Sequence, residues 1–158
     1  MRSKTPENET PQKVLSAAYG FLARRPHGRV ELKRKLERKG YAPELIDEVL
    51  AGLVHKGYLN DEEVALRWAQ SFAQNRLWGR AKIAAYLTER GIAGDIIDRV
   101  QGRIWEEFKE DDIARRALAK RFSHGPPPTR QKISMFLNSR GFSADVIYRA
   151  VDESKPTG

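Results

Sequence analysis

Apolar side chains recur along this chain at the spacing of an amphipathic α-helix. In the first third, one run contains Val14 and Ala18, and a second contains Leu32 and Leu36. A third run forms a broad apolar stripe between residues 45 and 54. Positions three and four apart share one side of a helix, so each run predicts a helix with one buried face. No stretch sustains the period-two alternation that is typical of strands.

The same three runs occur three times, with a period of about fifty residues. Each second run ends in a basic residue followed by glycine, which gives Gly40, Gly91 and Gly141. The positions that repeat around these glycines are Phe21, Phe72 and Phe122, then Arg29, Arg80 and Arg130, then Ile46, Ile97 and Ile147. Such self-similarity indicates a tandem array, in which each repeat covers the apolar face of its neighbour.

The residues between the runs agree with helices. Each repeated glycine accepts the left-handed conformation that ends a helix, and the preceding Lys or Arg favours the negative end of the helix dipole. Pro43 suits the first turn of the next helix, Asn60 with Glu63 resembles a capping box, and Ser143 can cap the last helix. We therefore predict an all-α protein of nine helices, arranged as three tandem three-helix repeats in an elongated, curved array.

The boundaries of the repeats follow from the same signals. We expect repeats at residues 13–60, 61–111 and 112–153, flanked by disordered tails at residues 1–12 and 154–158. Neither proline nor a strong glycine break separates the second and third repeats. We therefore expect their join in the acidic stretch 106–112, with nearly continuous helices there.

Composition adds a concentrated positive charge. The chain has 158 residues, of which 40% are hydrophobic and 32% charged, and its net charge is +8. Between residues 24 and 39, only two acidic residues oppose eight basic ones, which are Arg24, Arg25, Arg29, Lys33, Arg34, Lys35, Arg38 and Lys39. Such a concentrated field attracts polyanions or acidic protein surfaces. The alternative is a solvated helix face whose long side chains cover apolar surface.

Several classes of function find no support in the sequence. The chain lacks cysteine, an apolar run of roughly 20 residues that could span a bilayer, and an apolar signal segment at its start. The histidines His27, His55 and His124 lie far apart and show no metal-ligand spacing, and there is no glycine-rich phosphate loop. We expect a cytoplasmic monomer that is not an enzyme, makes no membrane contact and holds no metal or other cofactor.

The candidate binding residues are cations and one tryptophan. The expected contacts to a partner or to DNA are Arg24, Arg25, Arg29, Lys33 and Arg34, extended by Arg80, Lys82, Arg130 and Lys132. The arginines that recur once in each repeat either line one face or secure the start of the second helix. Trp78 lies beside Arg76 and Arg80, so it either stacks on a base, anchors a protein interface, or holds its own loop.

Taken in order, these motifs resemble the RecX family, the small regulators of the bacterial recombinase RecA. The resemblance covers roughly residues 13–152 and includes Lys39-Gly40-Tyr41 and Arg140-Gly141-Phe142. Its most recognisable stretch is Gly57-Tyr58-Leu59-Asn60-Asp61. The chain departs from the family at Val64, where an aromatic residue is usual, and at His27, where serine is frequent.

The resemblance implies a protein that binds the RecA filament on single-stranded DNA. There it would limit filament growth, ATP hydrolysis, strand exchange and co-protease activity, and so act in homologous recombination, DNA repair and the SOS response. Family members can also bind DNA directly, whether single- or double-stranded, and no enzymatic activity goes with the family.

A second interpretation is a DNA-binding protein of the helix-turn-helix kind, acting as a transcription or nucleoid factor. The basic composition favours it. However, the third helix of each repeat is expected to begin with Glu44, Asp95 or Asp145, whereas a recognition helix presents Arg, Asn or Gln at that end. A third interpretation is a passive structural scaffold.

Overall fold

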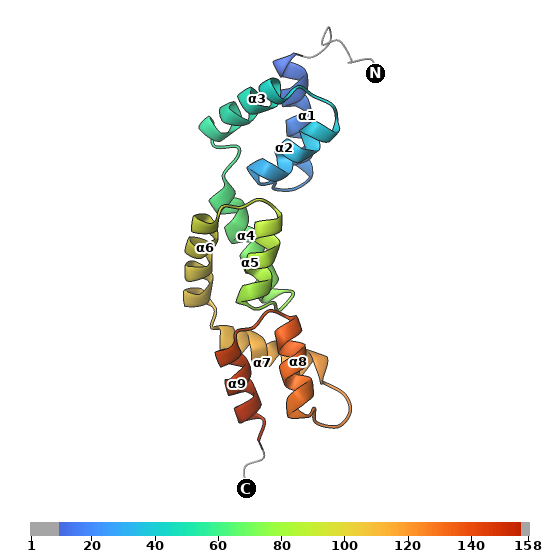
Figure 1. Ribbon diagram of the computed structural model, residues 1–158, viewed down its shortest axis with the longest axis vertical. Coiled ribbons are helices and arrows are strands. Elements are labelled where there is room, and N and C mark those ends of the chain that lie inside the picture. Colours follow the sequence, from blue (N-terminus) through green and yellow to red (C-terminus); the bar gives the residue numbers. More distant parts are fainter. Residues whose placement is uncertain (1–9, 156–158) are drawn as a thin grey trace. The chain divides into compact units, whose positions relative to one another are not determined.

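The computed structural model describes residues 10–155, and within that range it contains nine α-helices and no strand (Figure 1). The prediction of an all-α fold with three three-helix repeats is therefore confirmed. In chain order the helices are α1 (Pro11–Arg24), α2 (Arg29–Arg38), α3 (Pro43–His55), α4 (Asp61–Gln74), α5 (Arg80–Glu89), α6 (Gly94–Glu107), α7 (Glu110–Arg121), α8 (Arg130–Ser139) and α9 (Ala144–Glu153).

The helices end where the repeated glycines predict. Gly40, Gly91 and Gly141 have φ angles of 89°, 80° and 83°, the left-handed conformation that glycine adopts without a steric penalty. At the other ends, the Asn60 side chain accepts the backbone N–H of Glu63 over 3.2 Å, as the capping-box pattern predicts. Ser143 likewise caps α9.

Two boundary expectations need correction. The α1 helix begins at Pro11, because Thr10 accepts the N–H of Lys13 and proline fits the first turn, so residues 11 and 12 are not part of a tail. The helices α6 and α7 are not nearly continuous, because Phe108 between them has an extended backbone, with φ −112° and ψ 125°. The break still falls inside the predicted stretch. Most of the tails expected at residues 1–12 and 154–158 lies outside the described residues.

The backbone groups into two units. The described part of the first consists of residues 10–64 and 90–92, and that of the second of residues 65–89 and 93–155. In the first unit, α1 and α2 both pack on α3. Their shared core is formed by Val14, Ala18, Leu32, Leu36, Ile46, Val49, Leu50, Leu53 and Leu59. These are the apolar positions of the helical pattern, so burial explains the pattern.

The second unit holds the rest of the middle repeat and the whole last repeat. In it, α5 packs on α6, and α9 packs on both α7 and α8. The core of the last repeat contains Ile113, Ala114, Ala117, Ile133, Leu137, Phe142, Val146 and Ala150, with Leu77 from the loop before α5. Leu77 is the one non-glycine residue with positive φ, 57°, in the described range, and burial of its side chain holds it there.

Candidate functional site

The recurring arginines each occupy the first position of a second helix, where Arg29 begins α2, Arg80 begins α5 and Arg130 begins α8. The backbone N–H of Arg29 donates to Asp61 Oδ1 over 2.8 Å, and that of Arg80 donates to Glu110 Oε1 over 3.3 Å. Both acids lie in the first turn of the helix that follows the repeat. The backbone of these positions therefore has a structural role, while the side chains of all three arginines are exposed.

The loop after α8 contacts the start of α5 through backbone hydrogen bonds. The N–H of Gly79 donates to the carbonyl oxygen of Arg140 over 2.7 Å, and the N–H of Ala81 donates to that of Gly141 over 2.9 Å. A Cβ atom on Gly141 would lie 2.5 Å from the Cβ of Lys82, closer than carbon atoms can approach. Glycine is thus required there for close packing as well as for its backbone conformation.

Glu31 is a buried acid held by two arginines. Its side chain is 6% exposed, and its two carboxylate oxygens accept Nη1 and Nη2 of Arg25 over 3.0 and 3.1 Å. Arg90, which precedes the glycine that ends α5, donates to the same carboxylate. Bidentate, charge-assisted hydrogen bonds of this kind are strong. The guanidinium of Arg25 is therefore occupied inside the fold, although the sequence placed it among the partner contacts.

His27 completes this cluster as a neutral ring. It is 1% exposed, and its Nδ1 lies 2.8 Å from the carbonyl oxygen of Arg25, which can only accept, so Nδ1 carries the proton. Its Nε2 then accepts from Lys35 Nζ, 2.7 Å away. A protonated ring would lose this acceptor and face Lys35 as a second cation.

The protonation equilibria of the cluster follow from burial and from these partners. Burial lowers the pKa of His27 below its ordinary 6.5, and the charges of Arg25 and Lys35 act in the same direction, against the bond to the Arg25 carbonyl. Burial would raise the pKa of Glu31, but the hydrogen bonds from Arg25 and Arg90 outweigh it, so that pKa is lowered from 4.5. Burial and the neighbouring Arg25 lower the pKa of Lys35.

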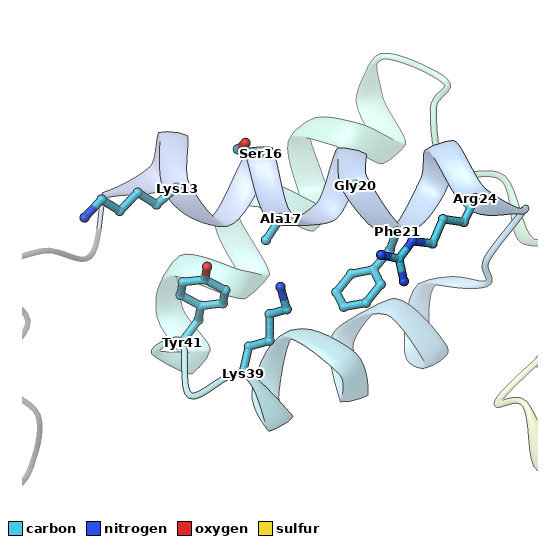
Figure 2. A pocket seen from close by; sticks show the side chains of 8 residues that line it. All are labelled: Lys13, Ser16, Ala17, Gly20, Phe21, Arg24, Lys39 and Tyr41. Carbon is cyan, nitrogen blue, oxygen red and sulfur yellow. The ribbon is translucent and has the colours of Figure 1, made fainter.

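A basic pocket lies on the first unit, between α1 and the end of α2 (Figure 2). Its volume is about 660 Å³, and its lining includes Lys13, Arg24 and Lys39 but no acidic residue. Figure 2 shows the ring of Phe21 between the side chains of Arg24 and Lys39, and the Lys39 ammonium lies 5.2 Å from the centre of that ring. Arg24 thus belongs to a surface of uniform positive charge that contains an aromatic ring.

The remaining sequence candidates are placed on exposed helix surface. Arg29, Arg130 and Lys132 are exposed, and Lys33 forms a surface ion pair with Asp47 at 3.0 Å. Such surface pairs are weak and exchange readily with solvent or a partner. Contacts of these residues, and of Arg24, Arg34, Arg80 and Lys82, with a partner stay a prediction.

Trp78 is held within the second unit by other side chains. Its ring stacks on Phe72 with a centroid distance of 4.4 Å and an interplanar angle of 18°. The Lys82 ammonium lies 4.6 Å from the ring centre, and the Arg76 guanidinium lies 5.8 Å from it. An aromatic ring therefore covers one face of Trp78 and two cations lie near the ring, which favours the loop-anchor interpretation over base stacking.

A second basic pocket adjoins Trp78. Its volume is about 430 Å³. The residues that line it are Asn75, Arg76, Leu77, Trp78, Ala117, Lys120, Arg121, Phe136 and Arg140, which gives four cations and no acid. Arg140 also donates from Nη1 to the carbonyl oxygen of Arg76 over 3.0 Å and lies over the ring of Phe136. The binding residues predicted from the sequence did not include Arg76, Lys120, Arg121 or Arg140.

Across residues 10–155, histidine and acidic side chains form no group of three that could hold a metal ion. None of the helices described combines the length and apolar character that a membrane span needs.

The fold and these surfaces define a class: an all-α protein of three tandem three-helix domains whose exposed pockets are basic. Sequence models of the first, second and third three-helix domains of RecX match residues 15–53, 60–100 and 109–151. The chain therefore belongs to the RecX family.

Individual relatives agree with this assignment. The chain is 37% identical over 117 residues to the regulatory protein RecX of Pseudomonas syringae pv. tomato, covering 70% of this chain and 72% of that protein. It is 36% identical over 123 residues to the regulatory protein RecX of Halorhodospira halophila, covering 75% of this chain and 71% of that protein.

Solved structures share the fold. The crystal structure of RecX from Lactobacillus salivarius matches with a TM-score of 0.73 at 22% identity, over 91% of this chain and 96% of that one. A second crystal structure, of a regulatory protein RecX, matches with a TM-score of 0.78 at 21% identity, over 90% of this chain and 73% of that one.

Proposed function

We propose that this protein regulates the bacterial recombinase RecA by binding the RecA filament on single-stranded DNA. Bound there, it limits filament growth, ATP hydrolysis and strand exchange. The observation that carries the proposal is the presence of all three RecX domains in order between residues 15 and 151. Relatives that match most of the chain bear the name of a regulatory protein.

The surface chemistry supports a polymeric or acidic partner. One basic pocket lies on the first repeat and another is lined by the second and third repeats, and neither has an acid in its lining. Such surfaces attract phosphate or carboxylate groups and speed encounter with them. Repeats in tandem also suit a filament, which itself repeats its subunits.

The proposed contact set consists of cations predicted from the sequence, most of which are exposed. It comprises Arg24, Arg29, Lys33 and Arg34 in the first repeat, extended by Arg80, Lys82, Arg130 and Lys132. Arg25 is left out, because Glu31 occupies its guanidinium. Trp78 is left out as a stacking residue, because Phe72 covers one face of its ring.

The decisive experiment measures ATP turnover by RecA on single-stranded DNA while the protein is added at substoichiometric ratios. A filament regulator suppresses turnover well below one copy per RecA, because one bound copy affects many subunits. A plain DNA-binding protein, including one of the helix-turn-helix kind, suppresses turnover only when enough is present to cover the DNA. A stoichiometric response that extra DNA relieves would refute the proposal.

A further inference from the structure

The repeats place different chemistry at the same positions. Aligning Gly40 with Gly91 and Gly141 makes the first-repeat residues Arg25, His27, Glu31 and Lys35 correspond to Arg76, Trp78, Lys82 and Tyr86 of the second repeat. Arg90, which reaches the first set from the end of α5, corresponds to Arg140 at the end of α8. The two sets can therefore be compared position by position.

In the first set a buried acid pairs with two of the cations. Arg25 and Arg90 converge on the carboxylate of Glu31, which is almost fully buried. The residues around it donate to this carboxylate or, like Lys35, to the ring of His27. The chain itself supplies the acid that pairs with the two arginines, so this arrangement needs no external ligand.

In the second set the two corresponding arginines line one pocket, but the acid is missing. Arg140 donates to the backbone of Arg76, and both line the 430 Å³ pocket beside Trp78. The position of Glu31 is taken by Lys82, whose ammonium lies over the Trp78 ring. Lys120 and Arg121 add two more cations to the lining, in which no acidic residue takes part.

The backbone keeps these cations together. The hydrogen bonds from Gly79 and Ala81 to the loop at Arg140 and Gly141 bring the two segments into direct contact. Cations held close together in this way repel one another, and an anion bound between them removes that repulsion. The bond from Arg140 to the Arg76 carbonyl also orders one of these cations before a ligand binds, which lowers the entropic cost of binding.

We propose that the pocket of Arg76 and Arg140 binds a carboxylate from an acidic segment of a protein partner. The bound carboxylate pairs with Arg76 and Arg140, as the Glu31 carboxylate pairs with Arg25 and Arg90 in the first set. The four lining cations exceed the charge of one carboxylate, which suits a segment with several Asp or Glu residues. This inference rests on the proposed function for the identity of the partner, but the chemistry of the site is tested without RecA.

A protein segment fits this pocket better than a nucleic acid does. The precedent inside the same chain is a carboxylate gripped by guanidinium groups, with both oxygens used. Nucleic-acid sites of comparable size pair cations with an aromatic face that stacks on a base. Here Phe72 occupies one face of Trp78 and the Lys82 ammonium lies over the ring.

The test uses the full chain and a blocked, fluorescent hexaglutamate peptide, with binding followed by anisotropy at low salt. The key variant is Lys82→Glu, which restores the internal acid of the first set. We expect it to weaken peptide binding at least about tenfold and to raise the thermal midpoint, because the new carboxylate pairs with Arg76 and Arg140. Arg103→Glu makes the same change of charge on an exposed face of α6 and should alter binding less than about twofold.

Each other outcome has a definite meaning. Arg140→Gln, checked for unchanged helicity, provides a second variant that should weaken binding if Lys82→Glu does not fold. Absence of peptide binding to the unmodified protein, or equal losses in Lys82→Glu and Arg103→Glu, overturns the inference. So does a hexamer of thymidylate that binds more tightly than the peptide and responds to Lys82→Glu, which would assign the pocket to nucleic acid. If the peptide binds as expected while RecA turnover is not suppressed, the proposed function fails and the site stands.

Discussion

The carboxylate of Asp61 caps the backbone of Arg29, from which it is 32 positions away in the sequence, with Oδ1 2.8 Å from the amide nitrogen. Glu110 does the same for Arg80. In each case an acid at the start of one repeat satisfies a helix that belongs to the repeat before it. Helix caps are usually local in sequence, so these two make the repeats depend on one another for complete hydrogen bonding.

Removal of this cap should destabilise the protein measurably. We expect Asp61→Ala to lower the free energy of unfolding by about 1 kcal/mol, because the first N–H of α2 loses its acceptor. Asp98→Ala, an exposed acid on α6, is the control and should change it by less than about 0.5 kcal/mol. Urea unfolding followed by circular dichroism measures both values. Equal effects would mean that the Asp61 bond contributes nothing specific.

The repeated glycines should differ in their tolerance of alanine. Gly40 has positive φ but open space around its missing Cβ, so Gly40→Ala should cost only the backbone term, about 1–2 kcal/mol. Gly141→Ala adds a clash with the backbone of Lys82 and should cost about 3 kcal/mol or more. Thermal unfolding of the two variants side by side gives the comparison. A Gly141→Ala protein as stable as Gly40→Ala would show that the loop can move away.

The cluster around buried Glu31 predicts that the free energy of unfolding falls in two steps as the pH is lowered. The pKa of His27 is lowered in the folded protein, so the unfolded chain takes up a proton first and stability falls as the pH drops below 6.5. The pKa of Glu31 is also lowered, so a second loss begins as the pH drops below 4.5. Each unit of difference in pKa corresponds to about 1.4 kcal/mol.

The variant His27→Gln separates the two steps. Glutamine can donate to the Arg25 carbonyl and accept from Lys35 without titrating. Its urea midpoint should therefore stay level between pH 8 and pH 5, while that of the unmodified protein falls. The loss at lower pH, which belongs to Glu31, should persist in the variant. A parallel decline in both proteins above pH 5 would remove His27 from the explanation.

Reversal of exposed charge should weaken the proposed regulation. The double variant Arg24→Glu and Arg29→Glu should inhibit RecA less, by about tenfold in the concentration needed, because both side chains are exposed cations of the proposed contact set. Lys56→Glu with Arg103→Glu reverses two exposed cations outside that set and should leave inhibition unchanged. Equal inhibition of RecA by the unmodified protein and both double variants would contradict a contact through Arg24 and Arg29 of the first repeat.

Direct binding to DNA can be recognised by how its affinity depends on salt concentration. Phosphate contacts release counterions, so affinity for single-stranded DNA should fall steeply with salt, and the slope should become shallower when contacting cations are removed. Titrations at several salt concentrations with the unmodified and double-variant proteins provide the slopes. A response that is flat with salt would exclude phosphate contacts.

Helix positions could be read from the sequence because local signals determine them. The recurrent pattern around Gly40, Gly91 and Gly141 fixed both the number of helices and where the second helix of each repeat ends. The break at Phe108 could not be read in this way, because neither glycine nor proline marks it and the extended backbone there depends on tertiary packing.

The binding surfaces were harder to predict because they depend on contacts between distant segments. Sequence counting treated Arg25 as a free cation and Glu31 as a minor opposing charge, whereas Arg90, 59 positions away, joins them in one buried cluster. A signal for this was nevertheless present: aligning the repeats places Lys82 opposite Glu31 and Arg140 opposite Arg90. A change of charge between aligned positions of the repeats can therefore indicate a binding surface that the net charge of the chain does not reveal.

Thr129 stands where the first two repeats have Gly28 and Gly79, and its own hydroxyl accepts the N–H of Lys132 over 3.2 Å. The α8 helix thus starts without help from a following module, unlike α2 and α5. Addition of a further repeat would require glycine in place of Thr129. The added repeat would also have to supply an acid and a glycine loop that contact the start of α8. The residue at the position of Thr129 thus determines whether the second helix of a repeat can accept a cap from another repeat.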